Sequence, residues 1–393
     1  GGVCYNYASQ YGGGIYCNGY VSAIEIRMNS GNINANKTYN TSTSYGMGGG
    51  VWMNYSCDLY MSGGTINKNF ASRFGGGVYL SKDARLFMYG TALIGETGAT
   101  LATDSSYGNT AITGGGVYAK GEGGGNEDKR PRVFLGVHRD TGESISFTDL
   151  DSDYGIRRNY ASGAISDIEY TVNNVAPGTG FGGGVYCEHA CFYARTGTVG
   201  YNLATKGGGV TILGSYESYG VWPGLDSPTA KIIGNKATDN GGGVYVKRQS
   251  FRVYGSVVNN VSGGNGGGIY NHVGSIDISH DDAKVDSNNA VKGGGIYSAD
   301  GTGDDNSGNI EFTAGSISYN QATIEGGGVY SNNYNDYFSM EGGTMAYNYA
   351  GSCGGAVSGL LKIKGTVTFT YNPAYEGKNK YNDIYCDGST TTR

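Results

Sequence analysis

Short runs of alternating apolar and polar residues, bounded by glycine or asparagine, recur along the whole chain. In Leu59-Tyr-Met61 and Phe338-Ser-Met340 the apolar side chains stand two residues apart. This spacing is typical of strands that bury one face, because successive side chains of a strand point to opposite sides. Amphipathic helical spacing is not evident anywhere. The pattern predicts an all-β protein built from many short strands.

A cluster of three glycines opens each repeat of the pattern. It reads Gly-Gly-Gly, then Val or Ile, then in most copies an aromatic residue, beginning at Gly12, Gly48, Gly75, Gly114, Gly182, Gly241, Gly266, Gly293 and Gly326, with variants at Gly207 and Gly354. Most starts lie 25–36 residues apart, a period typical of solenoids. The longer interval from Gly114 to Gly182 predicts two turns, with Ser162-Gly-Ala-Ile165 as a degenerate copy.

An asparagine followed two residues later by Ala forms a second landmark, a few positions before each glycine cluster. Full copies, with an apolar residue three positions earlier, lie at Asn6, Asn69, Asn159, Asn202, Asn235, Asn288, Asn320 and Asn348. Looser copies lie at Asn36, Asn174, Asn260 and Asn372, and Thr97 replaces the asparagine once. Asparagine tolerates the left-handed conformation at a bend, and its amide can bond the asparagines of adjacent coils. We therefore expect a structural ladder of stacked asparagines.

Each repeat should hold three short strands: one after the glycine cluster, one before a Gly-Gly pair and one ending at the asparagine. Three such strands cannot close a core alone, but stacked coils bury a continuous interior. The sequence therefore predicts a right-handed parallel β-helix of about thirteen coils, a single domain over residues 1–393, with loop insertions near 119–142, 165–181, 215–228 and 299–309. A β-propeller is disfavoured, because its blades need about 40–45 residues.

The aromatic residue of the glycine-cluster motif should point outward, because the Val before it points inward. The outward tyrosines should form an exposed stripe that serves as a binding surface, at Tyr79, Tyr118, Tyr186, Tyr245, Tyr270, Tyr297 and Tyr330. Two roles stay open: the stripe stiffens the rod by stacking, or it contacts proteins or glycans.

Composition narrows the choice of partners. The chain has 74 Gly, 35 Tyr and 5 Pro among 393 residues, which excludes collagen and disordered chains. Its formal net charge is −6 and its Lys and Arg residues are scattered, so nucleic acid is not expected as a partner. No apolar run suited to membrane insertion is visible.

At these landmarks the chain resembles the repeats of chlamydial polymorphic membrane proteins, whose motifs are GGA followed by Ile, Leu or Val, and FxxN. Gly354-Gly-Ala-Val matches the first motif and Phe369-Thr-Tyr-Asn372 the second. Over nearly its whole length the chain is also similar to GGGVY-rich surface proteins of spirochaetes, other bacteria and some protists. The resemblance implies a parallel β-helix at the cell surface with an adhesin-like role.

The two ends of the sequence complement each other. Ile384-Tyr-Cys386-Asp-Gly resembles the segment that begins at Ile15, near the start. An uncapped solenoid end exposes a strand edge that templates pairing, so copies of the chain are expected to stack head to tail into filaments. The alternative is that the sequence is a segment of a longer array. Either way we expect an extracellular structural rod or adhesin, with itself and host or matrix glycans or proteins as partners.

One acidic segment is a candidate metal site. Asp149, Asp151 and Asp153 stand two residues apart, a spacing that suits structural Ca²⁺. A solvated row of carboxylates on a strand or loop is the simpler interpretation, and no other cofactor is expected.

The cysteines predict two disulfide bonds. Cys187 and Cys191 lie two and six residues after the Val of their glycine cluster, and Cys17 and Cys57 occupy the same offsets in consecutive coils. We therefore expect the bridges Cys187–Cys191 and Cys17–Cys57, as suits an oxidising extracellular setting. A metal site at Cys187, His189 and Cys191 is the alternative, although a fourth ligand is not evident.

A polysaccharide-binding or polysaccharide-degrading protein of the pectate-lyase type is the main alternative to a structural role. Such an enzyme needs convergent carboxylates with a Lys, Arg or His in one cleft. The four histidines fall in different coils, and no Lys or Arg ladder accompanies the acidic groups. We therefore expect no catalytic residues and a protein that is not an enzyme.

Overall fold

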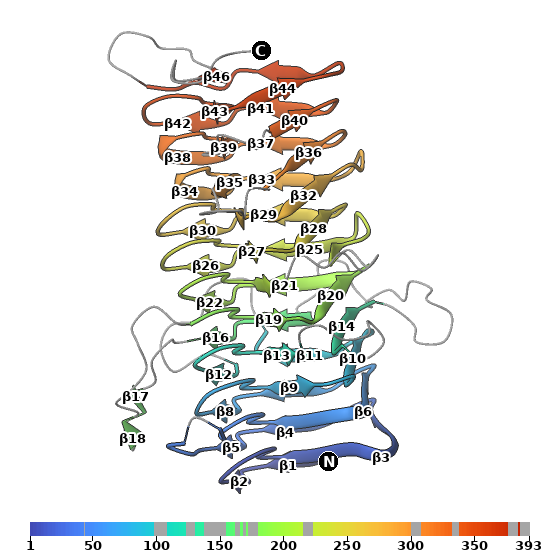
Figure 1. Ribbon diagram of the computed structural model, residues 1–393. Helices are drawn as coiled ribbons and strands as arrows, with labels where there is room; N and C mark the ends of the chain where they lie inside the picture. Colours follow the sequence, from blue (N-terminus) through green and yellow to red (C-terminus); the bar gives the residue numbers. More distant parts are fainter. Residues whose placement is uncertain are drawn as a thin grey trace. The chain divides into compact units, whose positions relative to one another are not determined.

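The computed structural model describes residues 1–42, 44–97, 108–122, 130–136, 155–161, 166–167, 170–171, 180–214, 223–299, 308–331, 338–375 and 384–385. They form two compact units, Gly1–Val221 and Trp222–Arg393, and each unit is a parallel β-helix whose coils follow one another in chain order (Figure 1). A single domain over the whole chain stays a prediction.

In the first unit three parallel sheets surround the core. The long sheet contains β3 (Ile15–Met28), β6 (Val51–Met61), β9 (Val78–Ser81), β10 (Arg85–Met88), β13 (Val117–Lys120), β14 (Arg132–Leu135), β19 (Val185–Glu188), β20 (Cys191–Ala194) and β23 (Val210–Leu213). The ladder sheet contains β1 (Gly2–Cys4), β4 (Asn32–Asn34), β7 (Thr65–Asn67), β11 (Leu93–Gly95), β15 (Gly155–Arg157) and β21 (Gly197–Gly200). The short sheet contains β2 (Tyr7–Ala8), β5 (Lys37–Thr38), β8 (Phe70–Ala71), β12 (Thr110–Ala111), β16 (Tyr160–Ala161) and β22 (Leu203–Ala204). An antiparallel hairpin, β17 (Ser166–Asp167) and β18 (Tyr170–Thr171), lies in an insertion.

The second unit repeats the same three sheets. Its long sheet contains β24 (Gly224–Leu225), β27 (Val244–Lys247), β28 (Ser250–Val253), β31 (Ile269–His272), β32 (Ser275–Ile278), β35 (Ile296–Ala299), β36 (Ile310–Phe312), β39 (Val329–Ser331), β40 (Phe338–Met340), β43 (Val357–Gly359), β44 (Leu361–Ile363) and β46 (Ile384–Tyr385). Its ladder sheet contains β25 (Ala230–Ile233), β29 (Ser256–Val258), β33 (Lys284–Asp286), β37 (Ser316–Ser318), β41 (Thr344–Ala346) and β45 (Thr368–Thr370). Its short sheet contains β26 (Lys236–Ala237), β30 (Val261–Ser262), β34 (Asn289–Lys292), β38 (Gln321–Glu325) and β42 (Tyr349–Ala350).

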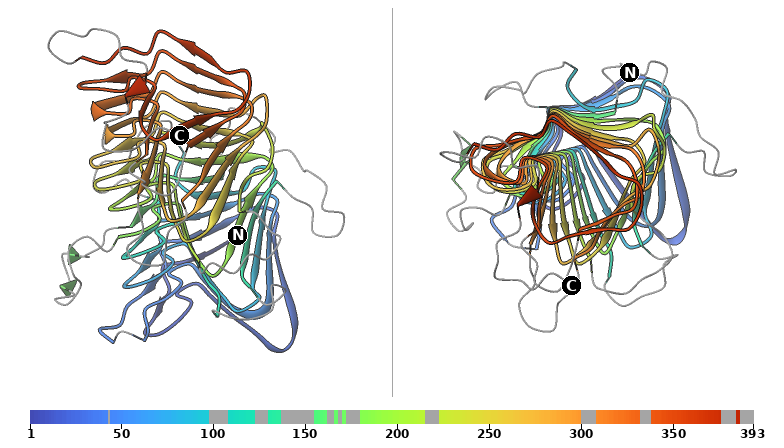
Figure 2. Two further views of the ribbon diagram at one scale, coloured as in Figure 1. Left: turned by 45° about the horizontal axis from the view of Figure 1, so that its top comes forward. Right: turned by 90° about the horizontal axis from the view of Figure 1, so that it is seen from above.

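The three strands expected in each repeat do not form three separate sheets. The strand after the glycine cluster and the strand before the Gly-Gly pair both belong to the long sheet; in β3 and β6 they are one continuous strand. The third sheet comes from the short segment after the asparagine, which the sequence pattern had marked only as a corner. Seen from above, the strands of successive coils overlie one another within each unit (Figure 2).

The long interval between Gly114 and Gly182 is one coil, so the prediction of two turns was wrong. Strand β13 pairs directly with β19, with Val117 opposite Val185. The segment that was interpreted as a degenerate repeat, residues 162–165, lies outside the described residues. Among the described residues the long sheet passes through twelve coils, compared with the expected number of about thirteen.

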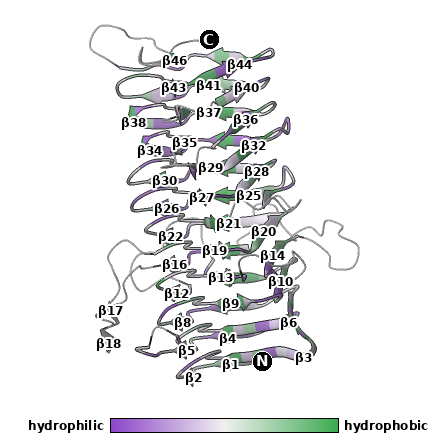
Figure 3. Ribbon diagram, viewed as in Figure 1, coloured by the Kyte–Doolittle hydropathy of each residue, from purple (hydrophilic) through white to green (hydrophobic). Residues whose placement is uncertain are grey.

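Alternation places the apolar side chains of all three sheets in one interior. Val51 and Leu59 of the long sheet, Ile66 of the ladder sheet and Ala71 of the short sheet have no exposed surface. Hydrophobic residues, coloured green, lie on the strands, where they alternate with hydrophilic residues, coloured purple (Figure 3). The burial of these side chains is the main source of stability, at roughly 25 cal/mol per Å² of apolar surface.

Each glycine of the cluster is required for a different reason. Gly75 has φ +66, a conformation that other residues adopt at a cost. A Cβ on Gly76 would lie 2.6 Å from the carbonyl oxygens of Gly115 and Thr110, and one on Gly77 would lie 3.0 Å from the amide nitrogen of Asn109. The cluster therefore permits both positive φ and the close approach of neighbouring coils.

Candidate functional site

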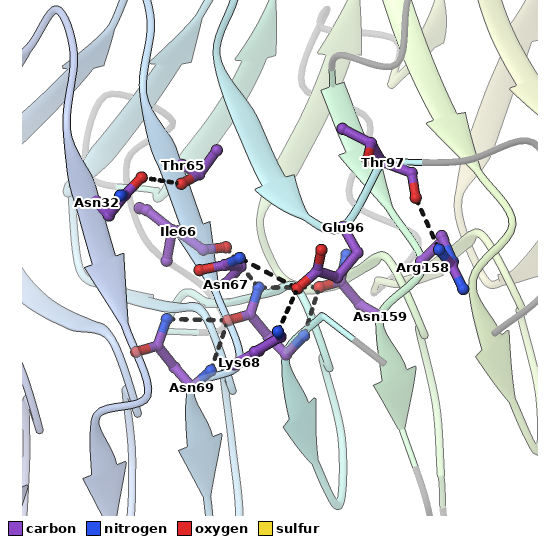
Figure 4. Close-up of polar contacts among 11 residues, drawn as sticks. Asn32, Thr65, Ile66, Asn67, Lys68, Asn69, Glu96, Thr97, Arg158 and Asn159 are labelled. Carbon is purple, nitrogen blue, oxygen red and sulfur yellow. Dashed lines mark hydrogen bonds and ion pairs between the residues drawn. The ribbon is translucent and has the colours of Figure 1, made fainter. Parts of the chain in front are cut away.

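A ladder of buried asparagine amides runs through each unit, as expected. The Asn69 side-chain nitrogen donates to Asn109 Oδ1 at 3.0 Å and to the Ile33 carbonyl at 2.9 Å, and the Asn69 backbone N–H donates to the same Asn109 oxygen at 3.1 Å. Figure 4 shows the ladder contacts that connect Asn69 to Asn159 across neighbouring coils. Amide-to-amide distances are 2.9–3.1 Å throughout, along Asn6, Asn36, Asn69, Asn109, Asn159 and Asn202 in the first unit and Asn235, Asn260, Asn288, Asn320, Asn348 and Asn372 in the second.

Two details of the predicted ladder were wrong. The asparagine in the fourth coil is Asn109, which precedes Ala111 by two residues, and not a position taken by Thr97. The left-handed residue is the one before the asparagine, for example Lys68 with φ 52 and Arg158 with φ 52. This placement turns the asparagine side chain inward, where its amide meets the next coil, and turns the preceding side chain outward.

The tyrosines that follow the glycine clusters stack as an aromatic column in each unit. In the first unit the column is Tyr16, Trp52, Tyr79, Tyr118 and Tyr186, with ring centroids 4.7–6.2 Å apart. In the second it is Tyr245, Tyr270, Tyr297 and Tyr330, at 5.0–5.2 Å. Near-parallel stacking of this kind stabilises neighbouring coils, so the structure supports the stiffening role of the stripe.

The expectation that these tyrosines form an exposed surface was wrong for most of the column. Tyr118 is only 3% exposed, and Tyr79, Tyr186 and Tyr245 are also buried. Only Tyr270, Tyr297 and Tyr330 are half-buried.

In the first unit, the apolar residue just before several of the glycine clusters contributes to this burial. In the first unit Tyr11, Met47, Phe74 and Phe181 pack against the column, and the Phe74 ring stacks on Tyr118 at 4.7 Å.

Burial suppresses ionisation of the column. It raises the pKa of the Tyr79 phenol, and separately that of Tyr245, from 10.0 to about 12. Burial raises the pKa of Tyr186 further, and the neighbouring Glu188 carboxylate, which accepts a hydrogen bond from the Tyr186 hydroxyl at 3.1 Å, adds to the effect. The phenols are neutral near pH 7, so the column is apolar packing and offers no acid–base group.

The two predicted cysteine pairs occupy different positions, although their sequence offsets are equal. The Cys17 and Cys57 sulfurs lie 2.6 Å apart in the interior, with no bond between them in this structure, and burial raises the pKa of the Cys17 thiol to about 12. By contrast, Cys191 aligns through β14 and β10 with Asp58, one position beyond Cys57. The turn before Cys191 is one residue shorter, so the offsets do not correspond. Both disulfides stay predictions.

The predicted calcium ligands Asp149, Asp151 and Asp153 lie outside the described residues, so that site stays a prediction. In the part of the chain that the structure describes, no three His, Cys, Asp or Glu side chains gather closely enough to hold a metal ion. Cys187, His189 and Cys191 are among the described residues and are not gathered in this way, so a metal site there stays an untested alternative.

The sequence analysis missed a set of exposed tyrosines in the second unit. Tyr319, Tyr347 and Tyr371 occupy the left-handed position before the ladder asparagine in three successive coils, with φ of 54, 55 and 45. They are 57%, 45% and 61% exposed. A signal was present in the sequence, because each is a Tyr-Asn pair in phase with the repeat.

No family model, curated protein or solved structure matches the chain. The parallel sheets and the asparagine ladders by themselves identify the chain as a parallel β-solenoid repeat protein. Among the described residues, none forms a helix of the length and apolarity needed to cross a membrane.

Proposed function

We propose that the chain is a stiff structural element outside the cell, as a filament subunit or as the stem of a surface adhesin. The observation that carries this proposal is the repetition of the same asparagine contact at every described junction between ladder coils of a unit, at 2.9–3.1 Å. The aromatic column adds a second contact along the same direction.

These contacts join each coil only to its neighbours. A buried hydrogen bond contributes about 1 kcal/mol and an aromatic pair about 0.5–1.5 kcal/mol, so their sum grows with the number of coils. The interior holds packed side chains, and the column is covered from Trp52 to Tyr186 of the first unit, although Tyr16 in the first coil is exposed. This distribution favours a scaffold over a polysaccharide-cleaving enzyme.

The proposed place outside the cell rests on the GGGVY repeats and their resemblance to surface proteins. Immunogold electron microscopy of intact source cells tests it with antibodies against the purified chain. We expect gold on the surface or on projecting fibres. Label confined to the cytoplasm would overturn the proposal.

Self-association is part of the same proposal. Strand β3 of the first coil pairs with β6, and Tyr16 is 54% exposed whereas its stacked neighbour Trp52 is buried. A coil added on this side, from a second copy or from further residues of the same chain, would continue the stack. Native mass spectrometry of the full-length protein distinguishes these sources: a concentration-dependent series of multimers is expected, and a strict monomer at high concentration rules out the filament.

A further inference from the structure

The left-handed position before the ladder asparagine changes abruptly along the second unit. Its side chains are small in the first three coils and aromatic in the next three, in the order Gly234, Asn259, Ser287, Tyr319, Tyr347 and Tyr371. Bulky residues adopt this conformation at a cost, and the preceding coils show that the fold does not need them there. Positive φ is a feature of this bend throughout the fold, so the change that calls for an explanation is the run of three exposed aromatic side chains.

The stacking geometry fixes which way the rings face. The Tyr319 and Tyr347 rings lie 5.0 Å apart with an angle of 14° between their planes, and their coils are adjacent, with Ser318 of β37 opposite Ala346 of β41. The ring faces therefore point along the stacking direction of the coils. Tyr347 lies between Tyr319 and Tyr371, and the ring centroids of Tyr347 and Tyr371 are 6.2 Å apart.

The other face of Tyr319 points to the coil that carries Ser287. Strand β33 of that coil pairs with β37, with Asp286 opposite Ser318. The Ser287 side chain is too small to stack on a ring, and among the described residues Tyr319 has Tyr347 as its only stacked partner. Its 57% exposure, against 45% for Tyr347, agrees with one open face.

Hydrogen-bonding groups lie next to Ser287 in the coil that this face points to. Asp286 Oδ1 accepts from the Ser287 hydroxyl at 2.9 Å, and the Asp286 carboxylate is half-buried. The exposed Asn289 side-chain nitrogen donates to Gln321 Oε1 at 3.2 Å. The coil that the open face of Tyr319 points to thus carries a carboxylate, a hydroxyl and an amide within two residues of Ser287.

We propose that the open face of Tyr319, together with Ser287, Asp286 and Asn289, binds a pyranose ring of a neutral polysaccharide. The C–H face of the sugar stacks on Tyr319 in the place where the next ring of the column would be. Contact at about 3.5–4.0 Å fits within one coil spacing of about 4.8 Å. The sugar hydroxyls bond Asp286 and Asn289. The Asp286 carboxylate disfavours anionic sugars, and the small Asn259 in the next coil leaves room for the polymer to continue.

This inference goes beyond the proposed function, because it assigns a ligand to one surface of the second unit. The test uses the full-length chain and a panel of cello-, xylo-, manno- and β-1,3-gluco-oligosaccharides, with affinity measured by isothermal titration calorimetry. Binding of at least one oligosaccharide is expected. Tyr319→Ala should weaken it about tenfold or more, whereas Tyr319→Phe should keep most of it, because the ring carries the contact.

Two further variants separate binding from folding. Ser287→Tyr should extend the tyrosine stack into the vacant position and abolish binding, with hydrogen exchange of the ladder strands unchanged. Tyr5→Ala removes an exposed left-handed tyrosine of the first unit and should leave affinity unchanged. The inference is overturned if no oligosaccharide binds, if Ser287→Tyr binds like the unmodified chain, or if Tyr319→Ala behaves like Tyr5→Ala. Surface location by immunogold is independent of these results, so the structural proposal survives such a failure.

Discussion

The two units share the same coil but protect their aromatic columns differently. In the first unit apolar residues precede the glycine clusters, and the Phe74 ring covers Tyr118 at 4.7 Å. In the second unit that position is polar, and Lys292 places its ammonium 4.7 Å from the centre of the Tyr330 ring while it bonds Glu325 at 3.3 Å. An apolar residue at this position therefore accompanies buried rings from Trp52 to Tyr186, and a polar one accompanies the half-buried Tyr270, Tyr297 and Tyr330, whereas Tyr245 is buried despite the polar Asn240.

The largest expected difference between the units concerns the columns themselves. Tyr118→Ala should lower the local free energy of unfolding of the first unit by about 4 kcal/mol, because it leaves a cavity in a covered column. Tyr297→Ala should cost the second unit about half as much, since its ring is half-buried. Hydrogen-exchange mass spectrometry of β13 and β35 measures both; equal losses would contradict the comparison.

Removing a ladder asparagine should lower the stability of both units by the same amount. Asn69→Ala and Asn288→Ala each remove buried hydrogen bonds to two neighbouring coils and should each cost about 3 kcal/mol. Exchange of the adjacent ladder strands measures the effect. Asn289→Ala, at a half-buried amide one residue along that bonds only Gln321 at the surface, is the matched control and should cost much less. A much smaller cost at one ladder position would show that the two ladders are not equivalent.

A covalent link would sharpen the comparison, because the Cys17 and Cys57 sulfurs of the first unit lie 2.6 Å apart. Peptide mapping without reductant should recover Cys17 joined to Cys57, and reduction should destabilise the first two coils by about 2 kcal/mol. Cys17→Ser should give the same loss, and reductant should leave exchange in β31 to β41 unchanged. Complete labelling of both thiols before reduction would refute the bridge.

Alkaline pH should weaken both units, the first more steeply. Burial raises the pKa of Tyr79 and Tyr245 from 10.0 to about 12, so the folded state keeps a proton that the unfolded state loses. Their stabilising contribution is complete below pH 10 and decreases between pH 10 and 12, by about 1.4 kcal/mol per pH unit for each phenol. Tyr118 and Tyr186 add to this slope in the first unit. Tyrosinate absorbance that appears before unfolding would contradict it.

The smallest expected effect comes from exchanging the covering residues. Phe74→Lys should cost the first unit about 1 kcal/mol, because a cation over Tyr118 replaces part of the lost aromatic contact. Lys292→Phe should protect β39 of the second unit by a similar amount or less. Exchange rates that move in the same direction in both variants would show that the covering residue does not set the burial of the column.

The sequence was sufficient for the fold, because glycine clusters and asparagines recur in phase and each meets one steric or hydrogen-bonding need. It was insufficient for register. The cluster spacing could not show that Gly114 and Gly182 belong to adjacent coils, and equal offsets placed Cys191 opposite Cys57 although it aligns with Asp58. Insertions and one-residue changes in turn length alter spacing without altering pairing, so only the hydrogen-bonded ladder reveals which residues face each other.

The alternation of side chains along a strand was also insufficient to predict which tyrosines are exposed. Alternation correctly turns Tyr118 away from the interior, but Phe74, which covers it, comes from the preceding coil, 44 residues earlier in the chain. Conversely, the exposed Tyr319 and Tyr347 sit at a bend, where no strand pattern applies. Whether an outward side chain is covered depends on neighbours along the stack, and a local pattern does not contain them.

The left-handed bend before each ladder asparagine separates the residue that joins neighbouring coils from the residue that forms the outer surface. The asparagine faces inward and is nearly invariant in kind from coil to coil, whereas the residue before it ranges from Gly234 through Lys68 and Arg158 to Tyr371. Mutations at this position alter the outer surface without touching the contacts that specify the coil. A solenoid of this type can therefore vary its surface one coil at a time while the asparagine contacts stay the same. The same positions offer sites at which new side chains can be introduced at regular intervals.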